Sequence, residues 1–240
     1  MSAEEAVAER LTAVRERIAA AAARAGRRSQ DVVLVGVAKR HSAALVTAAV
    51  RAGLRDVGEN YFQEAKAKIP EVRASLEGFG GALPRWHFVG RLQRNKARHV
   101  ATIFDVVQTL DRDRLGAALD RCAGEAGRKL SVLLEVNLSG EPTKGGVTPD
   151  ALPDLLAASA AWTNLDVAGL MTMPAPGEDP EAARPVFTRL RHLAESLRDA
   201  PGGADLRDLS MGMSADFETA IEEGATLVRV GTAIFGPRAR

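Results

Sequence analysis

The segment DVVLVGVAKRHS, residues 31–42, is an apolar run that stops abruptly at a lysine. Its apolar residues are nearly continuous from Val32 to Val37 and mostly β-branched, which is typical of a strand buried on both faces of a parallel sheet. Lys39 follows, with Arg40 and His41 behind it. A lysine there can extend its ammonium to solvent, or it can belong to a site at the strand end, and this segment alone leaves both interpretations open.

The rest of the chain repeats this alternation of short apolar runs and amphipathic stretches. We expect strands at residues 32–38, 56–58, 86–89, 104–108, 130–136, 166–170, 208–210 and 226–230. Helices are expected between them near residues 42–52, 61–69, 92–99, 112–126, 149–161, 181–199 and 215–223. Eight such βα units predict the α/β class and closure into a (β/α)8 TIM barrel. An open doubly wound sheet is the alternative, but no G-x-G-x-x-G follows the first strand to support it.

A further helix is expected before the barrel, over residues 3–25. Ser2 and Glu5 have the spacing of a capping box, and four apolar residues recur on one face: Val7, Leu11, Val14 and Ile18. The segment is too charged for a secretory signal, and it lacks the run of about 20 apolar residues that spans a membrane. With the barrel over residues 31–237 and no linker long enough to divide the chain, we expect a single domain over residues 1–240.

Composition narrows the classes of function. The chain has 240 residues, 46% of them hydrophobic and 26% charged, and a net charge of +1, which offers no electrostatic argument for nucleic acid or an anionic membrane. The single cysteine, Cys122, excludes an internal disulfide, fits the reducing cytoplasm, and is expected to be an inert packing residue. The four histidines, residues 41, 87, 99 and 192, lack the spacing of metal ligands, so no metal site is expected.

In a TIM barrel, functional side chains gather at the C-terminal ends of the strands. Lys39 lies at such an end, and a lysine partly withdrawn from water loses ammonium character, as Schiff-base chemistry with an aldehyde requires. Ser214 precedes a helix expected from Ala215, where free backbone N–H groups and the hydroxyl can bind an anion. Gly231 and Thr232, after the last strand, offer close backbone approach, a hydroxyl and an N–H.

Each of the last two features could be an ordinary turn and helix cap. Their joint occurrence in the loops after strands 7 and 8, which commonly hold phosphate in this fold, favours a phosphate site. Strand 1 adjoins strand 8 in a closed barrel, so a phosphate there and an aldehyde at Lys39 can belong to one ligand, pyridoxal phosphate. Arg229 alternates to the side that can face the ring, where a permanent charge would keep the pyridine nitrogen unprotonated.

Five segments carry a resemblance to a known family: VAK (37–39), GEN (58–60), WHFVGRLQRNK (86–96), GLMTM (169–173) and LSMGMSADFETAIEEGATLVRVGTAIFG (209–236). Over residues 5–238 the chain resembles the YggS/PROSC family of pyridoxal phosphate homeostasis proteins, related to the barrel domain of bacterial alanine racemase. The resemblance implies Lys39 as the aldimine lysine and Arg229 at the pyridine nitrogen. It implies phosphate contacts from Ser214, Gly231 and Thr232, and places Asn60 and Met213 among the cofactor-binding residues.

The chain departs from the family pattern beside the lysine, where many members have Ser-Lys-Thr-Lys and this chain has Ala38, Lys39, Arg40 and His41. It also has Arg91 and Arg94 where many members have histidine and serine. The basic segment 91–99 is interpreted as a solvated helix face or a rim that attracts anionic ligands. The loop Asn137–Lys144, after strand 5, receives no role.

Three functions compete. The first is a protein that holds pyridoxal phosphate as a lysine aldimine, without substantial turnover, and delivers it to apo-enzymes. The second is a pyridoxal-phosphate-dependent amino-acid racemase, and the third is a barrel enzyme acting on a phosphorylated sugar. A two-base racemase needs a proton-transfer group facing the lysine; in the racemase relatives a tyrosine from an additional domain fills this role, whereas the only tyrosine here is Tyr61 and the sequence ends at Arg240. We therefore expect a cytoplasmic, monomeric binding protein that is not an enzyme.

Overall fold

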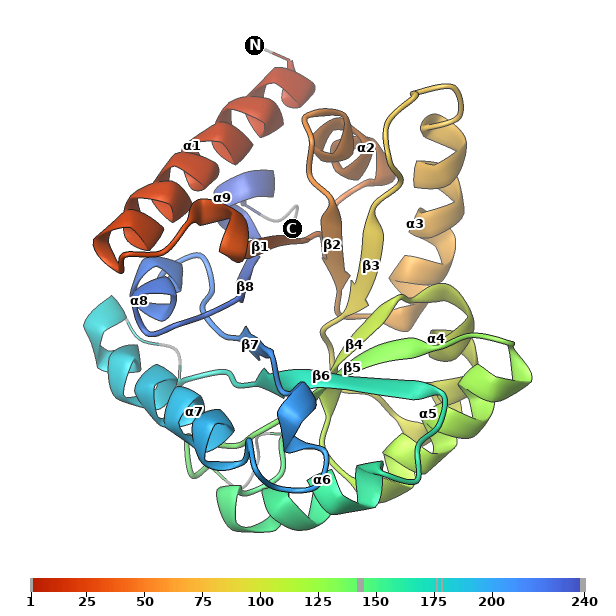
Figure 1. The fold of residues 1–240 in the computed structure, drawn as a ribbon. Coiled ribbons are helices and arrows are strands. Elements are labelled where there is room, and N and C mark those ends of the chain that lie inside the picture. The colour runs from red at the N-terminus through yellow and green to blue at the C-terminus, as the bar shows by residue number, and fades with distance from the viewer. Residues whose placement is uncertain (1, 142–144, 176, 178, 238–240) are drawn as a thin grey trace.

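Eight parallel strands form a closed barrel in chain order, with β8 returning to pair with β1 (Figure 1). This computed structural model describes residues 2–141, 145–175, 177 and 179–237. The strands are β1 Val33–Val37, β2 Asp56–Glu59, β3 Arg85–Phe88, β4 Val106–Leu110, β5 Leu130–Glu135, β6 Leu165–Met171, β7 Asp208–Ser210 and β8 Leu227–Val230. The prediction of a TIM barrel from the alternation of apolar and amphipathic segments is confirmed.

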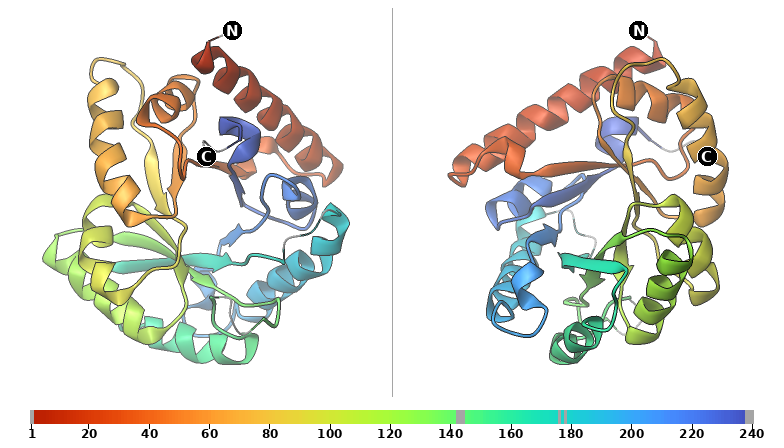
Figure 2. Two further views of the ribbon diagram at one scale, coloured as in Figure 1. Left: turned by 180° about the vertical axis from the view of Figure 1, so that it is seen from behind. Right: turned by 45° about the vertical axis from the view of Figure 1, so that its right-hand side comes forward.

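Helices surround the barrel on its outside in both views of Figure 2. They are α1 Ala3–Arg24, α2 Ala43–Arg51, α3 Phe62–Ser75, α4 Ala97–Ile103, α5 Asp113–Glu125, α6 Leu152–Ser159, α7 Arg184–Ser196, α8 Phe217–Glu222 and α9 Thr232–Phe235. Most of the apolar core lies between these helices and the strands. Cys122 is buried there with a free thiol, as expected of a packing residue. Within the described residues, no helix is long and apolar enough to cross a membrane.

The helix before the barrel forms as predicted. The Glu5 N–H donates to Ser2 Oγ at 3.1 Å and the Ser2 N–H donates to Glu5 Oε2 at 2.6 Å, which completes the capping box. The expected apolar face of α1 is buried. Figure 1 shows α1 beside α8 and α9, and Arg17 pairs with Glu218 of α8 at 2.7 Å. The helix therefore covers the seam where the last strand meets the first.

Some boundaries differ from those expected. The helix α3 continues through Pro70 to Ser75, because Ile69 and Val72 bury a continuous face against the barrel and offset the hydrogen bond that proline cannot donate. Strand β4 begins at Val106 rather than at residue 104, since Phe104 caps α4 and packs edge-on against Phe88 at 5.2 Å between centroids. The helix α8 begins at Phe217, two residues later than expected.

The inside of the barrel is unusually polar. Leu133, Ala168 and Met171 form a small apolar cluster that is separate from the main core. Much of the remaining interior is occupied by side chains that bond to one another and are at least 94% buried: Asp56, His87, Gln108, Ser210 and Arg229. Because these residues alternate with outward-facing apolar ones, the strands present two different faces, and the inner face supplies Arg229 to the site.

Candidate functional site

A cavity of about 260 Å³ opens where the strands end at their C-terminal side. All seven residues predicted to bind the cofactor line it: Lys39, Asn60, Met213, Ser214, Arg229, Gly231 and Thr232. Apolar contacts come from Val37, Val89 and Met173. The structure thus brings together side chains that are 193 positions apart in the sequence, at the end of the barrel where the fold places its functional loops.

Lys39 follows β1 in a turn that helix α3 holds in place. The Ala38 carbonyl accepts from the His41 N–H at 3.1 Å and from Lys68 Nζ at 2.7 Å. Arg40 has a φ of 61°, unusual for a residue with a side chain, and its N–H donates to Glu64 Oε2 at 2.8 Å. The backbone on both sides of Lys39 is therefore tied to α3, and the half-buried lysine side chain extends from a constrained turn into the cavity wall.

The Lys68 ammonium is itself buried and paired. It lies 2.5 Å from Glu59 Oε1, and the side chains of Lys68 and Glu59 are only 8% and 0% exposed. Burial raises the pKa of Glu59, while the bond to Lys68 opposes that rise. The second carboxylate oxygen of Glu59 has no hydrogen-bond partner among the described residues. This pair lies directly beneath the turn of Lys39 and beside Asn60, whose own Oδ1 is buried without a partner in the described chain.

Arg229 places a buried cation on the wall of the cavity. Two of its five N–H donors are used by neighbouring residues. Nη1 donates to Ser210 Oγ at 2.5 Å, and Nη2 donates to the Thr172 carbonyl at 2.9 Å. Burial lowers the pKa of Arg229 to about 10, and the carboxylates of Glu135 and Asp216 oppose this. The guanidinium therefore stays charged at neutral pH, and its orientation is fixed by two hydrogen bonds.

The loops after β7 and β8 meet at the other side of the cavity. Ser214 Oγ accepts the Gly231 N–H at 3.2 Å, which ties the two loops together. A Cβ on Gly231 would lie 3.2 Å from the Val37 carbonyl, so a side chain there would crowd β1. The Met213 N–H donates to Asp216 Oδ1 at 2.6 Å, which holds the first loop. Together the loops present hydroxyl groups and backbone amides of the kind that bind an anion.

The chemistry of this cavity suits one kind of ligand. An amine lies on the β1 side, a fixed cation lies on β8, and loops with hydroxyl and backbone N–H groups follow β7 and β8. These groups together can accommodate an aromatic ring that carries an electrophilic carbonyl, a polar ring atom and an anionic group. Such a set of groups is typical of cofactor sites in this fold rather than of a structural ion pair.

Comparison with known proteins identifies the family of the chain. Residues 10–239 match the family model described as "Alanine racemase, N-terminal domain". A pyridoxal phosphate homeostasis protein of Pseudomonas aeruginosa is 44% identical over 233 residues, which cover 97% of this chain and 96% of that protein. The chain belongs to the family of pyridoxal phosphate homeostasis proteins. The family predicted from the sequence motifs is therefore confirmed.

Two solved structures have the same fold. An unknown protein from Bifidobacterium adolescentis superposes with a TM-score of 0.90 at 34% identity, covering 97% of this chain and 95% of its own. PipY of Synechococcus elongatus, solved with pyridoxal phosphate bound, superposes with a TM-score of 0.81 at 35% identity, covering 96% of this chain and all of its own. Both solved structures thus share nearly the full length and the barrel fold of the chain described here.

One charged residue near the site was missed at the sequence level. Glu135 is the last residue of β5, it is buried, and its charge acts on Arg229. The signal that singled out Lys39, a charged residue ending an apolar strand, was present here too. Glu135 falls inside the expected strand 130–136, and only the loop that follows it from Asn137 was considered for a role. Within the described chain, no group of three or more His, Cys, Asp or Glu side chains could hold a metal ion.

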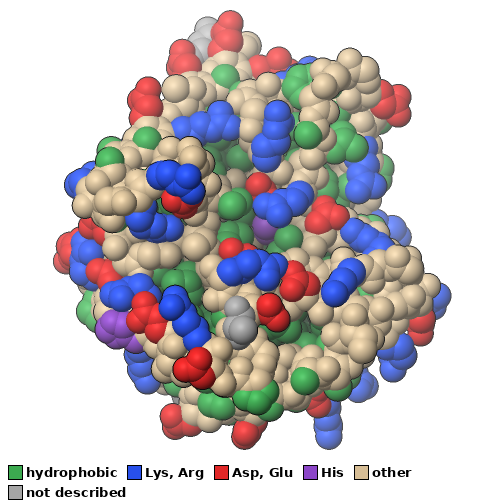
Figure 3. All heavy atoms as spheres, viewed as in Figure 1, with side chains coloured by type: hydrophobic (Ala, Val, Ile, Leu, Met, Phe, Trp, Pro, Cys, Tyr) green, Lys and Arg blue, Asp and Glu red, His purple; other side chains and the backbone are tan. Residues whose placement is uncertain are grey.

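None of the described residues of the basic segment 91–99 or of the loop after β5, residues 137–141, lines this cavity. Arg91 and Lys96 of the basic segment line an adjoining cavity that shares Asn60, and Lys96 and His99 both lie against the Phe62 ring. In the β5 loop, Ser139 Oγ donates to Asn137 Oδ1 at 3.0 Å, while Lys144 lies outside the described residues. Basic and acidic side chains are interspersed over the face in Figure 3, as the net charge of +1 suggests.

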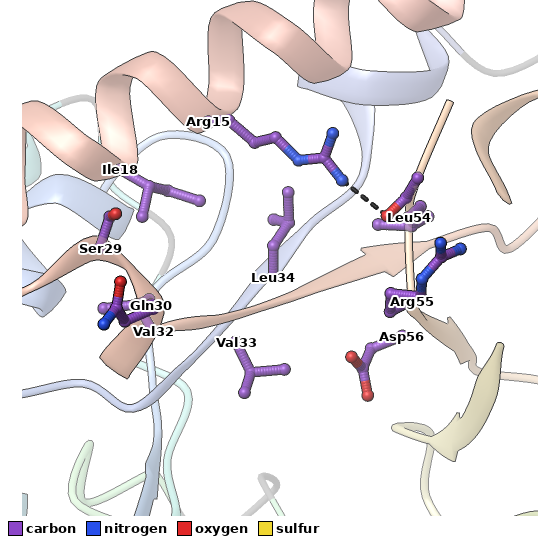
Figure 4. Close-up of a pocket in the computed structure, with 11 residues that line it drawn as sticks. Arg15, Ile18, Ser29, Gln30, Val32, Val33, Leu34, Leu54, Arg55 and Asp56 are labelled. Atoms are coloured by element: carbon purple, nitrogen blue, oxygen red, sulfur yellow. Dashed lines mark hydrogen bonds between the residues drawn. The ribbon is translucent and has the colours of Figure 1, made fainter. Parts of the chain in front are cut away.

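A cavity of about 360 Å³ opens at the opposite mouth of the barrel, where the strands begin (Figure 4). Arg15 extends from α1 across this cavity and donates to the Gly53 carbonyl at 2.7 Å, and Asp56 lies at its edge. The conserved geometry of TIM barrels assigns this end to stability rather than to chemistry. Residues of α1, of the start of β1 and of the segment leading into β2 line this cavity.

Proposed function

We propose that this chain binds pyridoxal phosphate, holds it through Lys39 without substantial turnover, and supplies it to apo-enzymes that depend on it. The observation that supports this most directly is that all seven residues predicted from the sequence line one cavity, with the amine, the fixed cation and the anion-binding loops on its walls. The homeostasis proteins that resemble the chain, and PipY with its bound pyridoxal phosphate, point to the same ligand.

The residues fit each part of that cofactor. Lys39 would bond to the aldehyde carbon, Arg229 would meet the pyridine nitrogen, and the Ser214, Gly231 and Thr232 loops would hold the phosphate. Met213 belongs to the first of these loops, directly before Ser214, and the unpartnered Oδ1 of Asn60 is an acceptor available to a donor on the ligand. When bound, the cofactor supplies an electrophilic aldehyde and a ring that withdraws electrons from bonds at the attached carbon.

Two features support binding without turnover. Arg229 is a charged guanidinium, which disfavours a proton on the pyridine nitrogen and so weakens the ring as an electron sink. Among the described residues that line the cavity, Lys39 is the one side chain that commonly exchanges protons in catalysis. We infer that the protein acts as a monomer in the cytoplasm. Its single, free cysteine fits that reducing compartment.

The test is chemical trapping of the bound cofactor. Purified protein mixed with pyridoxal phosphate is expected to develop a visible absorption band, and borohydride reduction followed by peptide mapping should place the adduct on Lys39. The Lys39→Ala variant should lose the band while keeping its fold, because a half-buried lysine at a strand end contributes little packing. The exposed Lys66 provides a matched control, and Lys66→Ala should keep the band. An adduct found only on another lysine would refute the assignment of Lys39.

A further inference from the structure

A chain of hydrogen bonds runs through the interior of the barrel from Arg229 to the opposite mouth. Arg229 Nη1 lies 2.5 Å from Ser210 Oγ, which lies 2.7 Å from Gln108 Oε1. Gln108 Nε2 lies 2.9 Å from His87 Nδ1, and His87 Nε2 lies 2.8 Å from Asp56 Oδ1. The five side chains come from β8, β7, β4, β3 and β2, and none is more than 6% exposed.

The direction of every bond in this chain follows from its first member. A guanidinium has only donors, so Ser210 Oγ accepts from Arg229 and uses its own proton to donate to Gln108 Oε1. The Gln108 amide must then donate to His87 Nδ1, which leaves the proton on Nε2 to donate to Asp56. If the Gln108 amide were reversed, it would donate to Ser210, whose proton would lose its acceptor at Gln108. The order that satisfies all groups runs one way, from cation to anion.

The far end of the chain lies outside the cofactor cavity. Asp56 lies at the edge of the cavity at the opposite mouth (Figure 4) and also accepts from Arg85 Nε at 2.8 Å. Gln108 and His87 line neither cavity among the described residues. Burying the Arg229 charge is costly unless its donors are satisfied, and a polarised chain that ends on a carboxylate stabilises it. The chain therefore links the charge at the cofactor's ring to a carboxylate at the other end of the barrel.

We propose that Ser210, Gln108, His87 and Asp56 are positioning residues for Arg229, and that they couple the ring nitrogen of the bound cofactor to the opposite mouth of the barrel. The identity of that ligand rests on the proposed function. The hydrogen-bond chain itself does not, because its order of donors is a property of the protein without ligand. A merely structural role would require these side chains to fill space, whereas positioning requires each donor and acceptor to be present.

The protein has only four histidines in its sequence, so nitrogen NMR of protein labelled with ¹⁵N-histidine can follow His87 directly. In protein without ligand, His87 is expected to carry its proton on Nε2 and to accept at Nδ1. Addition of pyridoxal phosphate should shift the His87 ring nitrogens, although His87 does not line the cavity, and should leave those of the exposed His192 unchanged. The same shift should be absent in Gln108→Met, which keeps the length of the side chain and removes both of its polar atoms.

Affinity provides the second measurement. Gln108→Met should weaken pyridoxal phosphate binding about threefold to tenfold, the factor expected for one net hydrogen bond, and change the visible spectrum. Asp56→Asn removes the terminal charge with little change of shape and should weaken binding about threefold. The matched control is Asp105→Asn, since Asp105 at the same mouth accepts from Arg128 Nη2 and the Trp86 N–H, both at 2.8 Å, outside the chain. The affinity of Asp105→Asn for pyridoxal phosphate should stay within about twofold of that of the unsubstituted protein.

The outcomes separate this proposal from the proposed function. If His87 carries its proton on Nδ1, or shows no shift at saturating cofactor, the hydrogen-bond chain does not act as described. Affinity and spectrum unchanged in folded Gln108→Met would overturn it as well. If Gln108→Met does not fold, Asp56→Asn and the histidine spectra decide. If pyridoxal phosphate does not bind at all, the proposed function fails, and the ligand-free state of His87 still decides whether the chain has the order inferred here.

Discussion

Glu135 is a buried carboxyl group at the end of β5, close to the charges that surround the cavity. Burial raises the pKa of Glu135 to about 7, the Asp111 carboxylate adds to this, and Arg229 and Arg91 oppose it. A Cβ on Gly145 would lie 3.2 Å from Oε1, so that glycine leaves room for the carboxyl group. Near neutral pH the folded protein thus holds this carboxyl group in comparable amounts of its protonated and charged forms.

This predicts a dependence of stability on pH. The folded-state pKa of Glu135 lies above its ordinary value of 4.5, so the folded protein retains the proton while the unfolded chain loses it. Stability should therefore fall as pH rises from about 4.5 to about 7, and stay lower above that range. Glu135→Gln, which needs no proton, should be more stable than the original by about 1–3 kcal/mol at pH 8 and nearly equal to it at pH 4.5. Urea denaturation at the two pH values measures the difference.

The exposed Glu71 provides the control for this comparison. Glu71→Gln should leave the free energy of unfolding within about 0.5 kcal/mol of the original at both pH values, as is usual for surface changes. A Glu135→Gln variant whose advantage is the same at pH 4.5 and pH 8 would show that packing, rather than ionisation, is responsible.

At the scale of elements, helix α3 anchors the turn of Lys39 through two side chains. Lys68 bonds to the Ala38 carbonyl and Glu64 accepts the Arg40 N–H, on either side of Lys39. The ammonium of Lys68 also neutralises Glu59 at the end of β2. The helix thus connects the ends of β1 and β2 at the wall of the cavity, and the stability of that wall depends on one buried ion pair.

Lys68→Met should destabilise the fold by about 3–5 kcal/mol, because it leaves the buried Glu59 carboxylate unpaired. The double variant Lys68→Met with Glu59→Leu should recover most of this loss, since two well-packed apolar side chains can replace a buried pair at little cost. Urea denaturation of the three proteins measures both effects. Equal stability of the single and double variants would mean that the unpaired charge is not the cause of the loss.

The loops after β7 and β8 form a second unit at this scale, and they should control affinity for the cofactor. Ser214→Ala together with Thr232→Val removes two hydrogen bonds to a charged phosphate, each worth about 1.5–3 kcal/mol. We expect pyridoxal phosphate to bind about a hundredfold more weakly or worse, with its visible band unchanged in position once it is bound. Titration followed by absorbance measures both quantities.

Ser159 on α6 is buried and donates to the Leu156 carbonyl at 2.6 Å, far from these loops in the sequence. Ser159→Ala therefore controls for the loss of one buried serine hydroxyl and should bind the cofactor as the original does. Unchanged affinity in the double variant would place the phosphate elsewhere.

At the scale of the whole molecule, the described barrel surrounds its cavity with a single group suited to proton transfer, Lys39. Racemisation of an amino acid needs a second such group on the opposite face of the cofactor, and the chain's one tyrosine, Tyr61, is 47% exposed beside the adjoining cavity. Protein loaded with pyridoxal phosphate is expected to leave the α-proton of L- and D-alanine in place. NMR in deuterium oxide, against free cofactor as a control, follows that proton. Exchange with inversion on the order of 10 per second, an ordinary enzyme rate, would instead establish a racemase.

Local patterns were sufficient for much of this fold. The β-branched run before Lys39 predicted β1, because a strand buried on both faces needs nearly continuous apolar residues. The alternation of short apolar runs with amphipathic stretches predicted the other seven strands, although several of them carry polar residues inside the barrel. The capping box of α1 was also readable, since its two hydrogen bonds join residues three apart. Boundaries were less accurate where burial overrode propensity, as in α3, where Pro70 lies inside the helix and Val72 is fully buried beyond it.

The order of the elements, the family and the residues at the cavity could be read from the sequence, since strand ends, glycines and caps are local signals that a closed barrel gathers at one mouth. The charges that meet inside the barrel could not be read in this way, and the folded structure was needed to identify them. Lys68 reaches Ala38 across 30 positions, and Ser210 reaches Gln108 across 102. Such contacts depend on which side of each strand faces inward and on how eight strands close, so buried polar partners far apart in the sequence become visible only when the barrel is complete.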